Sequence, residues 1–154
     1  MLEQVSPVAE ARRVELRRNA PRGLEVRVNR LLAEQALFNL VSNAIRYGGE
    51  GKPVELAADR DGSQVTIAVR DRGPGIAPKH LPRIFERFYR VDKARARADG
   101  GTGLGLAIVK HIAAVHGGSV EVTSTLGVGS EFRIRFPAGG PAGTPAGAPE
   151  SNIR

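Results

Sequence analysis

Two segments of this chain are each predicted to fold as a β-hairpin, and together they limit the kind of sheet that the chain can build. Residues 53–59 and 64–70 alternate apolar and polar side chains and are joined by Arg60-Asp61-Gly62-Ser63, a sequence typical of a hairpin turn. A second pair of strands is predicted at 119–125 and 130–136. Strands joined by short turns pair antiparallel, so we expect a mixed, mainly antiparallel sheet and not a doubly wound parallel one.

Three helices are expected beside these strands. In Arg30–Tyr47, apolar residues recur at helical spacing at Leu37, Leu40, Val41, Ala44 and Ile45. Asn29 is suited to cap this helix, and Gly48-Gly49 to end it. The predicted fold class is therefore α/β: a two-layer α/β sandwich, with about three helices on one face of the sheet.

The remaining elements are predicted with less pattern to support them. They are, in chain order, a helix at 3–13 whose start Pro7 limits, strands at 14–19 and 24–29, a short helix near Lys79–Phe85, a mobile loop at 91–100, a helix at Thr102–His116, and a disordered Pro/Gly/Ala-rich tail from Pro137.

Composition bounds the function as well as the fold. The 154 residues suffice for one domain with a core, and the absence of cysteine excludes disulfides and thiolate metal sites. There is no apolar run of membrane-spanning length and no signal-peptide pattern, so we expect a soluble, cytoplasmic domain without membrane contact of its own. The net charge of +7 raises a nucleic-acid binder as an alternative. Because the basic residues are scattered and aromatic residues are few, we expect no nucleic-acid partner.

The helix predicted at Arg30–Tyr47 carries a polar stripe beside its apolar one. Asn39, Asn43, Arg46 and Tyr47 are spaced i, i+4, i+7 and i+8, which places them on one side of the helix. Two amides next to a core-facing stripe indicate a polar ligand. Helix capping or simple exposure to solvent is the alternative explanation.

Two glycine-rich loops and a basic segment follow. Asp71-Arg72-Gly73-Pro74-Gly75-Ile76 comes directly after a predicted strand. Gly101-Thr102-Gly103-Leu104-Gly105-Leu106 opens a helix, where free N–H groups favour a phosphate. It follows a charged loop, and no G-K-[ST] comes after it, so neither a dinucleotide fingerprint nor a P-loop fits. Between the loops lie Arg87 and Arg90, which could clamp phosphate oxygens or simply be solvated.

Four segments stand in a fixed order: LFNLVSNAIRYGG (37–49), DRGPGI (71–76), RIFERFYR (83–90) and GGTGLGLAIVK (100–110). They resemble the N, G1, F and G2 boxes of the catalytic domain of bacterial two-component sensor histidine kinases, which belongs to the GHKL superfamily with DNA gyrase B and MutL. The resemblance covers about Leu24 to Phe136. It implies the Bergerat ATP-binding fold for a catalytic domain at 1–136, followed by the tail at 137–154.

The resemblance also implies roles for the matched residues. The position of Asn43 offers its amide oxygen to a Mg²⁺ that bridges the ATP phosphates, and those of Asn39, Arg46 and Tyr47 line the same pocket. Asp71 would accept a hydrogen bond from the exocyclic amine of adenine, where guanine has a carbonyl. Phe85 and Phe88 would anchor the two ends of an ATP lid by packing. The other expected ATP-binding positions are Gly73, Gly75, Ile76, Arg87, Arg90, Gly101, Thr102, Gly103, Leu104, Gly105 and Leu106. Asn39, Asn43 and Arg90 form the expected catalytic set, with Arg90 favoured over Arg87 for phosphate.

Asn39 separates the enzymes of this superfamily. Gyrase-like ATPases carry a water-activating glutamate four residues before the magnesium asparagine, and an amide cannot act as that base near neutral pH. Asn39 therefore favours a histidine kinase over a standalone GHKL ATPase or serine kinase. A degenerate ATP-binding interaction module is the other alternative, and the intact Asn43, Asp71 and box glycines oppose it.

The expected partners follow from what the chain lacks. His80, His111 and His116 precede Leu81, Ile112 and Gly117, and none has the acidic neighbour typical of a phospho-accepting histidine. We expect all three to be structural or exposed, and the acceptor to lie on a dimerisation domain of the same kinase, absent from this chain. A response regulator is the expected later partner, and the cytoplasmic part of a membrane-bound sensor kinase the expected location.

Overall fold

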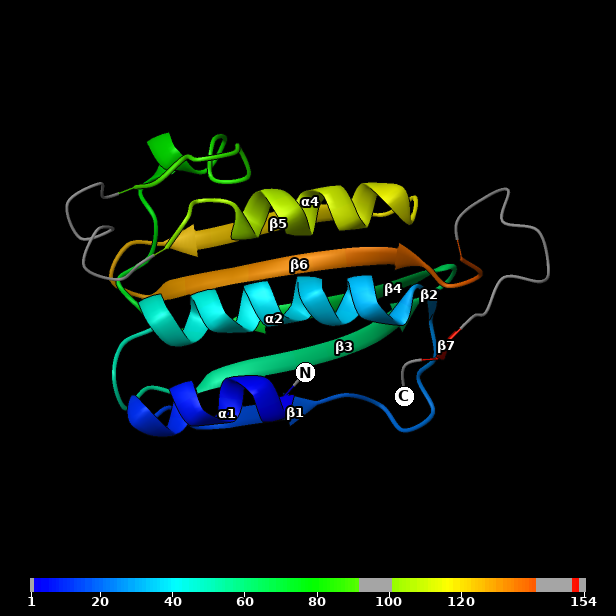
Figure 1. Ribbon diagram of the computed structural model, residues 1–154, viewed down its shortest axis with the longest axis horizontal. Helices are drawn as coiled ribbons and strands as arrows, with labels where there is room; N and C mark the ends of the chain where they lie inside the picture. Colours follow the sequence, from blue (N-terminus) through cyan, green and yellow to red (C-terminus); the bar gives the residue numbers. More distant parts are fainter. Residues whose placement is uncertain (1, 92–100, 141–150, 153–154) are drawn as a thin grey trace.

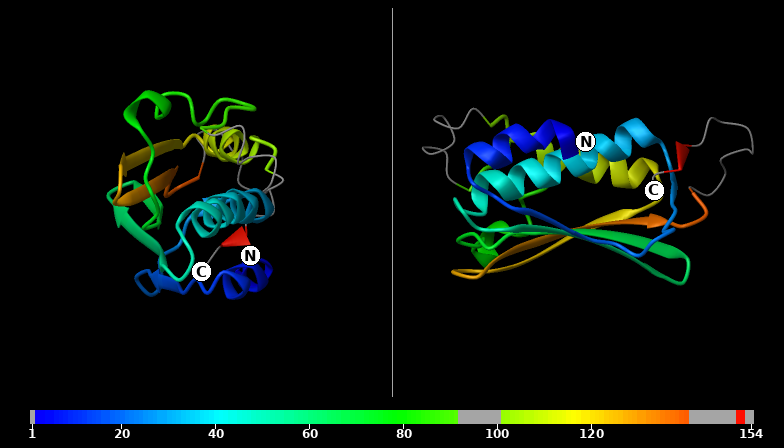
Figure 2. Two further views of the ribbon diagram at one scale, coloured as in Figure 1. Left: turned by 90° about the vertical axis from the view of Figure 1, so that its left-hand side faces the viewer. Right: turned by 90° about the horizontal axis from the view of Figure 1, so that it is seen from below.

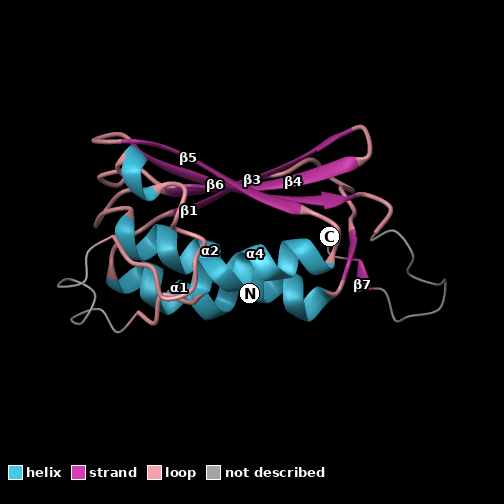
Figure 3. Ribbon diagram, turned by 90° about the horizontal axis from the view of Figure 1, so that it is seen from above, coloured by secondary structure: helices cyan, strands magenta, loops and turns pink. Residues whose placement is uncertain are grey.

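The computed structural model describes residues 2–91, 101–140 and 151–152 and arranges them in two layers (Figure 1). One layer is a five-stranded sheet of order β1-β3-β4-β6-β5. Its strands are β1 (Leu16–Asn19), β3 (Val54–Asp61), β4 (Gln64–Arg70), β5 (Ser119–Thr125) and β6 (Gly129–Pro137). The helices α1 (Leu2–Ala11), α2 (Arg30–Tyr47) and α4 (Gly105–Val115) form the other layer, all on the same face of the sheet (Figures 2 and 3). The predicted two-layer α/β sandwich is confirmed.

Both predicted hairpins are present, and they make the sheet mainly antiparallel. β3 pairs with β4 up to Asp61 opposite Gln64, and β5 pairs with β6 up to Thr125 opposite Gly129. β4 and β6 join the two hairpins antiparallel, while β1 lies parallel to β3. The parallel pair arises because the chain leaves β1, crosses the helical layer as α2 and returns as β3.

The core lies between the two layers. Alternate residues of the strands are buried, as the period-2 pattern predicts, and one stripe of each helix faces them. The buried residues of α2 are Ala33, Ala36, Leu40, Val41, Ala44 and Ile45, and those of the central strands include Val65, Val69, Phe132, Ile134 and Phe136. Leu37, predicted in the same stripe, is only half-buried.

The ends of α2 are those predicted. The Asn29 side chain accepts a hydrogen bond from the Leu32 amide at 3.1 Å, and the Gly48 amide donates to the Ala44 carbonyl at 2.8 Å. The buried His116, just after α4, supports the same end of α2. Its Nε2 accepts the Asn29 amide hydrogen at 3.0 Å, while its Nδ1 donates to the Ile112 carbonyl at 2.7 Å. Of the two roles expected for the histidines, structural or exposed, His116 has the structural one.

The strand predicted at 24–29 is shortened and lies outside the main sheet. Only β2 (Arg27–Val28) forms, and it pairs antiparallel with β7 (Ser151–Asn152) in a separate two-stranded sheet. The two residues that form it, Arg27 and Val28, are those that pair with Asn152 and Ser151. β7 belongs to the tail that was predicted to be disordered, and Pro137 itself ends β6. The rest of that tail prediction, at 141–150 and 153–154, lies outside the described residues, as does the loop predicted at 91–100 beyond Val91.

Other element boundaries also differ from the prediction: β1 starts at Leu16 and not at 14, and β3 runs on to Asp61. α1 starts at Leu2 with Pro7 inside it, because the burial of Val5 and Ala9 offsets the one hydrogen bond that proline removes. The short helix predicted near Lys79–Phe85 is a 3₁₀ turn, η1 (Pro78–His80). α4 begins at Gly105, three residues later than predicted, after a segment in which the Gly103 carbonyl accepts the Phe88 amide hydrogen. No helix among the described residues is long and apolar enough to cross a membrane.

Candidate functional site

The polar stripe of α2 faces the second glycine-rich loop. Asn39, Asn43 and Arg46 are half-buried on this stripe, and Tyr47 at its end is 48% exposed. A Cβ atom added to Gly105 would lie 3.6 Å from the Asn39 amide oxygen. One added to Gly101 would lie 2.8 Å from Nη1 of Arg46. The loop therefore follows the stripe closely, with glycine where the two approach most nearly.

The side-chain amide of Asn39 places a buried hydrogen-bond donor between α2 and this loop. Its Nδ2 atom is buried and has no hydrogen-bond partner among the residues that the structure describes. A buried donor without a partner is costly and therefore indicates that something else takes the bond. The start of α4, with its free N–H groups, lies against the same amide at Gly105.

Arg90 contacts the second glycine-rich loop at the same residue as Arg46. Its Nη1 donates to the carbonyl of Gly101, and its Nη2 lies 3.0 Å from the position of a Gly101 Cβ. Arg46 and Arg90 thus place two guanidinium groups beside Gly101. Together with the N-terminus of α4, they make this end of the molecule suited to a polyphosphate (left in Figure 1).

The two phenylalanines predicted to anchor a lid differ in what they do. Phe85 packs edge-to-face on Phe132 of the sheet, with ring centroids 6.3 Å apart, as expected of an anchor. The Phe88 side chain is 70% exposed, so the expectation that it anchors by packing is wrong. Its backbone makes the connection instead: the Phe88 amide donates to the Gly103 carbonyl at 2.9 Å, in a left-handed conformation with φ of 64°.

Asp71 begins the first glycine-rich loop and is buried beneath the end of α2. Its carboxylate Oδ1 accepts the Gly73 amide hydrogen at 2.8 Å. A Cβ on Gly48, the C-cap of α2, would lie 3.0 Å from the Asp71 Cβ. Burial raises the pKa of Asp71 above its ordinary value, against the opposing effects of backbone groups at Gly73 and Ser130 and of the Lys52 ammonium. A buried acceptor at a loop of this kind is suited to recognising a donor on a ligand.

The remaining predicted positions surround these groups. Ile76 and Leu106 are half-buried and pack against the core, and Leu104 caps α4. The Thr102 hydroxyl accepts a hydrogen bond from the Leu104 amide at 3.4 Å. Arg87 is exposed beside Phe88. Unlike Arg90, which donates to the Gly101 carbonyl, Arg87 faces solvent.

Three side chains touch this site without any motif to indicate them. Arg12 donates to the carbonyl of Arg46 at 2.8 Å, and the Lys52 ammonium donates to the carbonyl of Arg72 at 2.9 Å. Ser124 accepts a hydrogen bond from the Ile76 amide at 2.7 Å. Each makes its contact with a backbone atom far away in sequence, so no local spacing could have indicated it.

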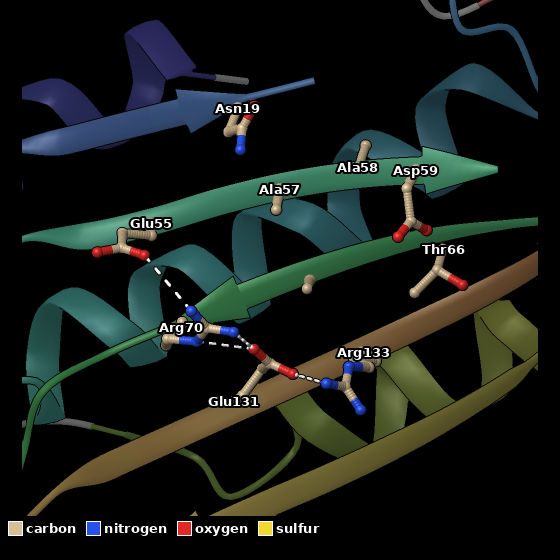
Figure 4. Close-up of a pocket in the computed structure, with 10 residues that line it drawn as sticks. Asn19, Glu55, Ala57, Ala58, Asp59, Thr66, Arg70, Glu131 and Arg133 are labelled. Atoms are coloured by element: carbon tan, nitrogen blue, oxygen red, sulfur yellow. Dashed lines mark hydrogen bonds and ion pairs between the residues drawn. The ribbon is translucent and has the colours of Figure 1, made fainter. Parts of the chain in front are cut away.

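A separate hollow lies on the open face of the sheet, away from the helices (Figure 4). Ala57 and Ala68, which pair across β3 and β4, leave it between charged neighbours. The buried Glu131 carboxylate forms ion pairs with Arg70 and Arg133 at its rim, and Arg70 also approaches Glu55 at 3.7 Å. These charged side chains pair with one another. Over the described ranges, none of the four motif segments contributes a residue to the lining of the hollow.

A known protein family matches the part of the chain that contains this site. Residues 28–140 match the family described as histidine kinase-, DNA gyrase B- and HSP90-like ATPases. The sensor-like histidine kinase SenX3 of Mycobacterium tuberculosis is 53% identical over 125 residues, which are 81% of this chain and 30% of SenX3. The sensor protein SrrB of Staphylococcus aureus is 47% identical over 104 residues, 68% of this chain and 18% of SrrB. The chain thus spans less than a third of the length of either relative.

Solved structures agree in fold. Full-length ShkA in complex with AMPPNP superposes with a TM-score of 0.77 at 35% identity, over 90% of this chain and 28% of ShkA. The mycobacterial sensor histidine kinase MprB gives a TM-score of 0.74 at 26% identity, over 90% of this chain and 91% of the MprB chain. The chain therefore belongs to the histidine kinase-, DNA gyrase B- and HSP90-like ATPase family, as a catalytic domain of the sensor histidine kinase type.

Proposed function

We propose that this domain binds Mg-ATP and transfers the γ-phosphate to a histidine on a separate dimerisation domain, in two-component signalling. The observation that carries the proposal is the convergence of Asn39, Arg46 and Arg90 on the loop at Gly101–Gly105. The buried Asp71 lies nearby, against the C-terminal end of α2. One region suits a polyphosphate and the other a base with an exocyclic amine. The complex of ShkA with AMPPNP, an ATP analogue, supports nucleotide as the ligand.

The base is assigned to the loop at Asp71–Ile76. The Asp71 carboxylate accepts the hydrogen bond of the adenine amine, and Gly73 and Gly75 allow the backbone to lie close to the ring. Ile76 offers an apolar edge from the core side. Guanine presents a carbonyl to the same carboxylate, so we expect selection for adenine.

The phosphates are assigned to α2, the second loop and the start of α4. Arg90 and Arg46 offset the charge of the phosphates, and Arg87 and Thr102 supply secondary contacts. The backbone of Gly101, Gly103 and Gly105 offers N–H groups, while Leu106 packs against the core and Leu104 caps α4. Tyr47 lines the nucleoside side of the pocket.

A magnesium ion fits this donor set only together with ATP. No group of three or more His, Cys, Asp or Glu side chains within the described part of the chain could hold a metal by itself. Asn43 supplies one neutral amide oxygen, and Mg²⁺ commonly takes its other ligands from phosphate and water. When bound, the ion would offset charge on the phosphate oxygens.

We place the nucleophile of the transfer outside this domain, since none of its three histidines has the acidic neighbour typical of a phospho-accepting histidine. His116 is buried with both ring nitrogens hydrogen-bonded, and His80 Nδ1 is bonded to the Tyr89 hydroxyl at 2.6 Å. We infer that an imidazole nitrogen of the dimerisation domain forms the new bond to the γ-phosphorus as the bond to the β–γ bridging oxygen breaks, which leaves ADP. Asn39 cannot deprotonate a water, so transfer is favoured over hydrolysis. We place the reaction in the cytoplasm, with a response regulator as the later acceptor.

Two measurements test the proposal. The first is calorimetric binding of an ATP analogue and a GTP analogue with and without Mg²⁺, on wild type and Asp71→Asn. Asp59→Asn, an exposed carboxylate on β3, is the matched control. We expect adenine-selective binding that Asp71→Asn abolishes and Asp59→Asn retains.

The second measurement is phosphorylation in trans of a dimerisation domain from a sensor histidine kinase, followed as acid-labile phosphate. Asn43→Ala should abolish it, while Gln35→Ala, an exposed amide on the same helix, should not. Nucleotide binding without transfer would indicate the interaction module instead. Fast hydrolysis without any acceptor would indicate the standalone ATPase.

A further inference from the structure

The loop assigned to adenine is attached to the β5–β6 hairpin at its start, at Asp71, and over its second half, at Pro74–Ile76. The Asp71 amide donates to the Ser130 carbonyl at 2.9 Å, and the Gly127 amide donates to the Pro74 carbonyl at 2.8 Å. At Gly75 the contact is so close that a Cβ would lie 2.2 Å from the Thr125 carbonyl oxygen. These contacts with the hairpin therefore fix the conformation of the loop.

Ser124 makes the last of these attachments through its side chain. Its hydroxyl oxygen accepts the Ile76 amide hydrogen at 2.7 Å, lies 3.0 Å from the Gly129 carbonyl and lies 2.9 Å from the Ser130 hydroxyl. A serine hydroxyl has one proton and two lone pairs. All three contacts are satisfied when Ser124 donates to Gly129 and accepts from Ile76 and Ser130.

The position of Ser124 in β5 also needs explanation. Alternate residues of this strand turn inward, and the two before Ser124 on that side, Val120 and Val122, pack against the core. Continuing the alternation would place another apolar residue at 124. A half-buried hydroxyl with a full set of partners indicates that the residue serves the loop and not the core.

We propose that Ser124 is a positioning residue for nucleotide specificity, which fixes the loop so that the Asp71 carboxylate meets the adenine amine. This inference rests on the proposed function. Ser124 reaches the loop at Ile76, five residues after Asp71, while the Ser130 carbonyl holds the Asp71 end. With both ends fixed to one hairpin, the carboxylate keeps its place. Without the Ser124 hydroxyl, the far end of the loop is free to shift and the Ile76 amide loses its acceptor.

The test compares ATP with inosine triphosphate, in which a carbonyl replaces the amine. Loss of a base-specific contact lowers the affinity for ATP alone, whereas general damage to the fold lowers both affinities. We expect Ser124→Ala to weaken ATP binding about tenfold, as loss of one well-placed hydrogen bond does, and to reduce the preference for ATP over inosine triphosphate by the same factor. Ser124→Thr, which keeps the hydroxyl, should retain most of the preference. Thr123→Ala, the exposed neighbour on β5, should match wild type.

Amide hydrogen exchange of Ile76 provides a second readout in the same proteins. We expect faster exchange in Ser124→Ala and wild-type protection in Ser124→Thr. An equal loss of both affinities in Ser124→Ala, or an unchanged preference, would overturn the inference. If wild type itself bound neither nucleotide, the proposed function would fail and the inference with it, so the two failures are distinguishable.

Discussion

Arg12 and Arg46 are 34 residues apart in sequence and joined by one hydrogen bond, from Nη1 of Arg12 to the backbone carbonyl of Arg46 at 2.8 Å. The carbonyl belongs to the last turn of α2, where helix carbonyls have no partner within the helix. The Arg12 carbonyl in turn accepts the Gly51 amide hydrogen at 3.1 Å. The turn after α1 thus holds both the end of α2 and the loop that follows it.

We therefore expect Arg12→Ala to lower the free energy of unfolding by about 1–2 kcal/mol, because it removes a hydrogen bond from a charged group and a cation at the negative end of a helix. Nucleotide affinity should fall as well, since Arg46 and Tyr47 lie in the released turn. Urea denaturation and calorimetry measure the two effects. Arg22→Ala, at an exposed arginine between β1 and β2, is the control and should change neither.

The buried Asp71 predicts a dependence of stability on pH. Burial raises the pKa of its carboxyl in the folded state, so the folded protein binds this proton more tightly than the unfolded chain. The contribution of Asp71 to the free energy of unfolding should fall as pH rises through the window from the ordinary aspartate pKa to the raised one. Urea denaturation of wild type and Asp71→Asn across that window isolates the contribution, since asparagine does not titrate.

In Asp71→Asn, adenine binding and stability at neutral pH should respond differently. Asp71→Asn should lose adenine binding and yet unfold at a urea concentration no lower than wild type at neutral pH, because it removes a buried charge. A large loss of stability in this variant at neutral pH would show that the hydrogen bond from Gly73 outweighs the cost of burial.

His116 should be a main support of the helical layer. It links the end of α4 to the Asn29 amide before α2, and its ring lies edge-to-face on Phe136 with centroids 5.6 Å apart. His116→Ala removes two hydrogen bonds and leaves a cavity, so we expect the free energy of unfolding to fall by about 2–4 kcal/mol. His111→Ala, an exposed histidine on α4, should change it by less than about 0.5 kcal/mol. Similar losses in both variants would contradict the assigned role.

The features predicted correctly from the sequence are those that local pattern determines. The strands around Val65 and Val69 alternate clearly, Asn29 and Gly48 are residues with a marked preference for helix ends, and the four segments carry the family resemblance. The errors arose where distant contacts decide. β2 is short because its partner is the distant two-residue strand β7, and Phe88 attaches through its backbone because Gly103 lies beside it. Arg12, Lys52 and Ser124 bind backbone atoms across the fold, which no spacing along the chain reveals.

The contact between the first glycine-rich loop and α2 gives the last prediction. A Cβ on Gly73 would lie 2.3 Å from the Tyr47 carbonyl oxygen and 3.0 Å from the Asp71 carboxylate. Because the first of these is a backbone atom at a helix end, it cannot move aside cheaply, and Gly73→Ala must push the loop away from α2. We expect nucleotide affinity to fall by more than about tenfold, with a loss of about 1–3 kcal/mol in unfolding free energy. Gly139→Ala has open space around the added methyl and should behave as wild type in calorimetry and urea denaturation. Wild-type affinity in Gly73→Ala would mean that the loop does not need this approach to α2 in order to bind its ligand.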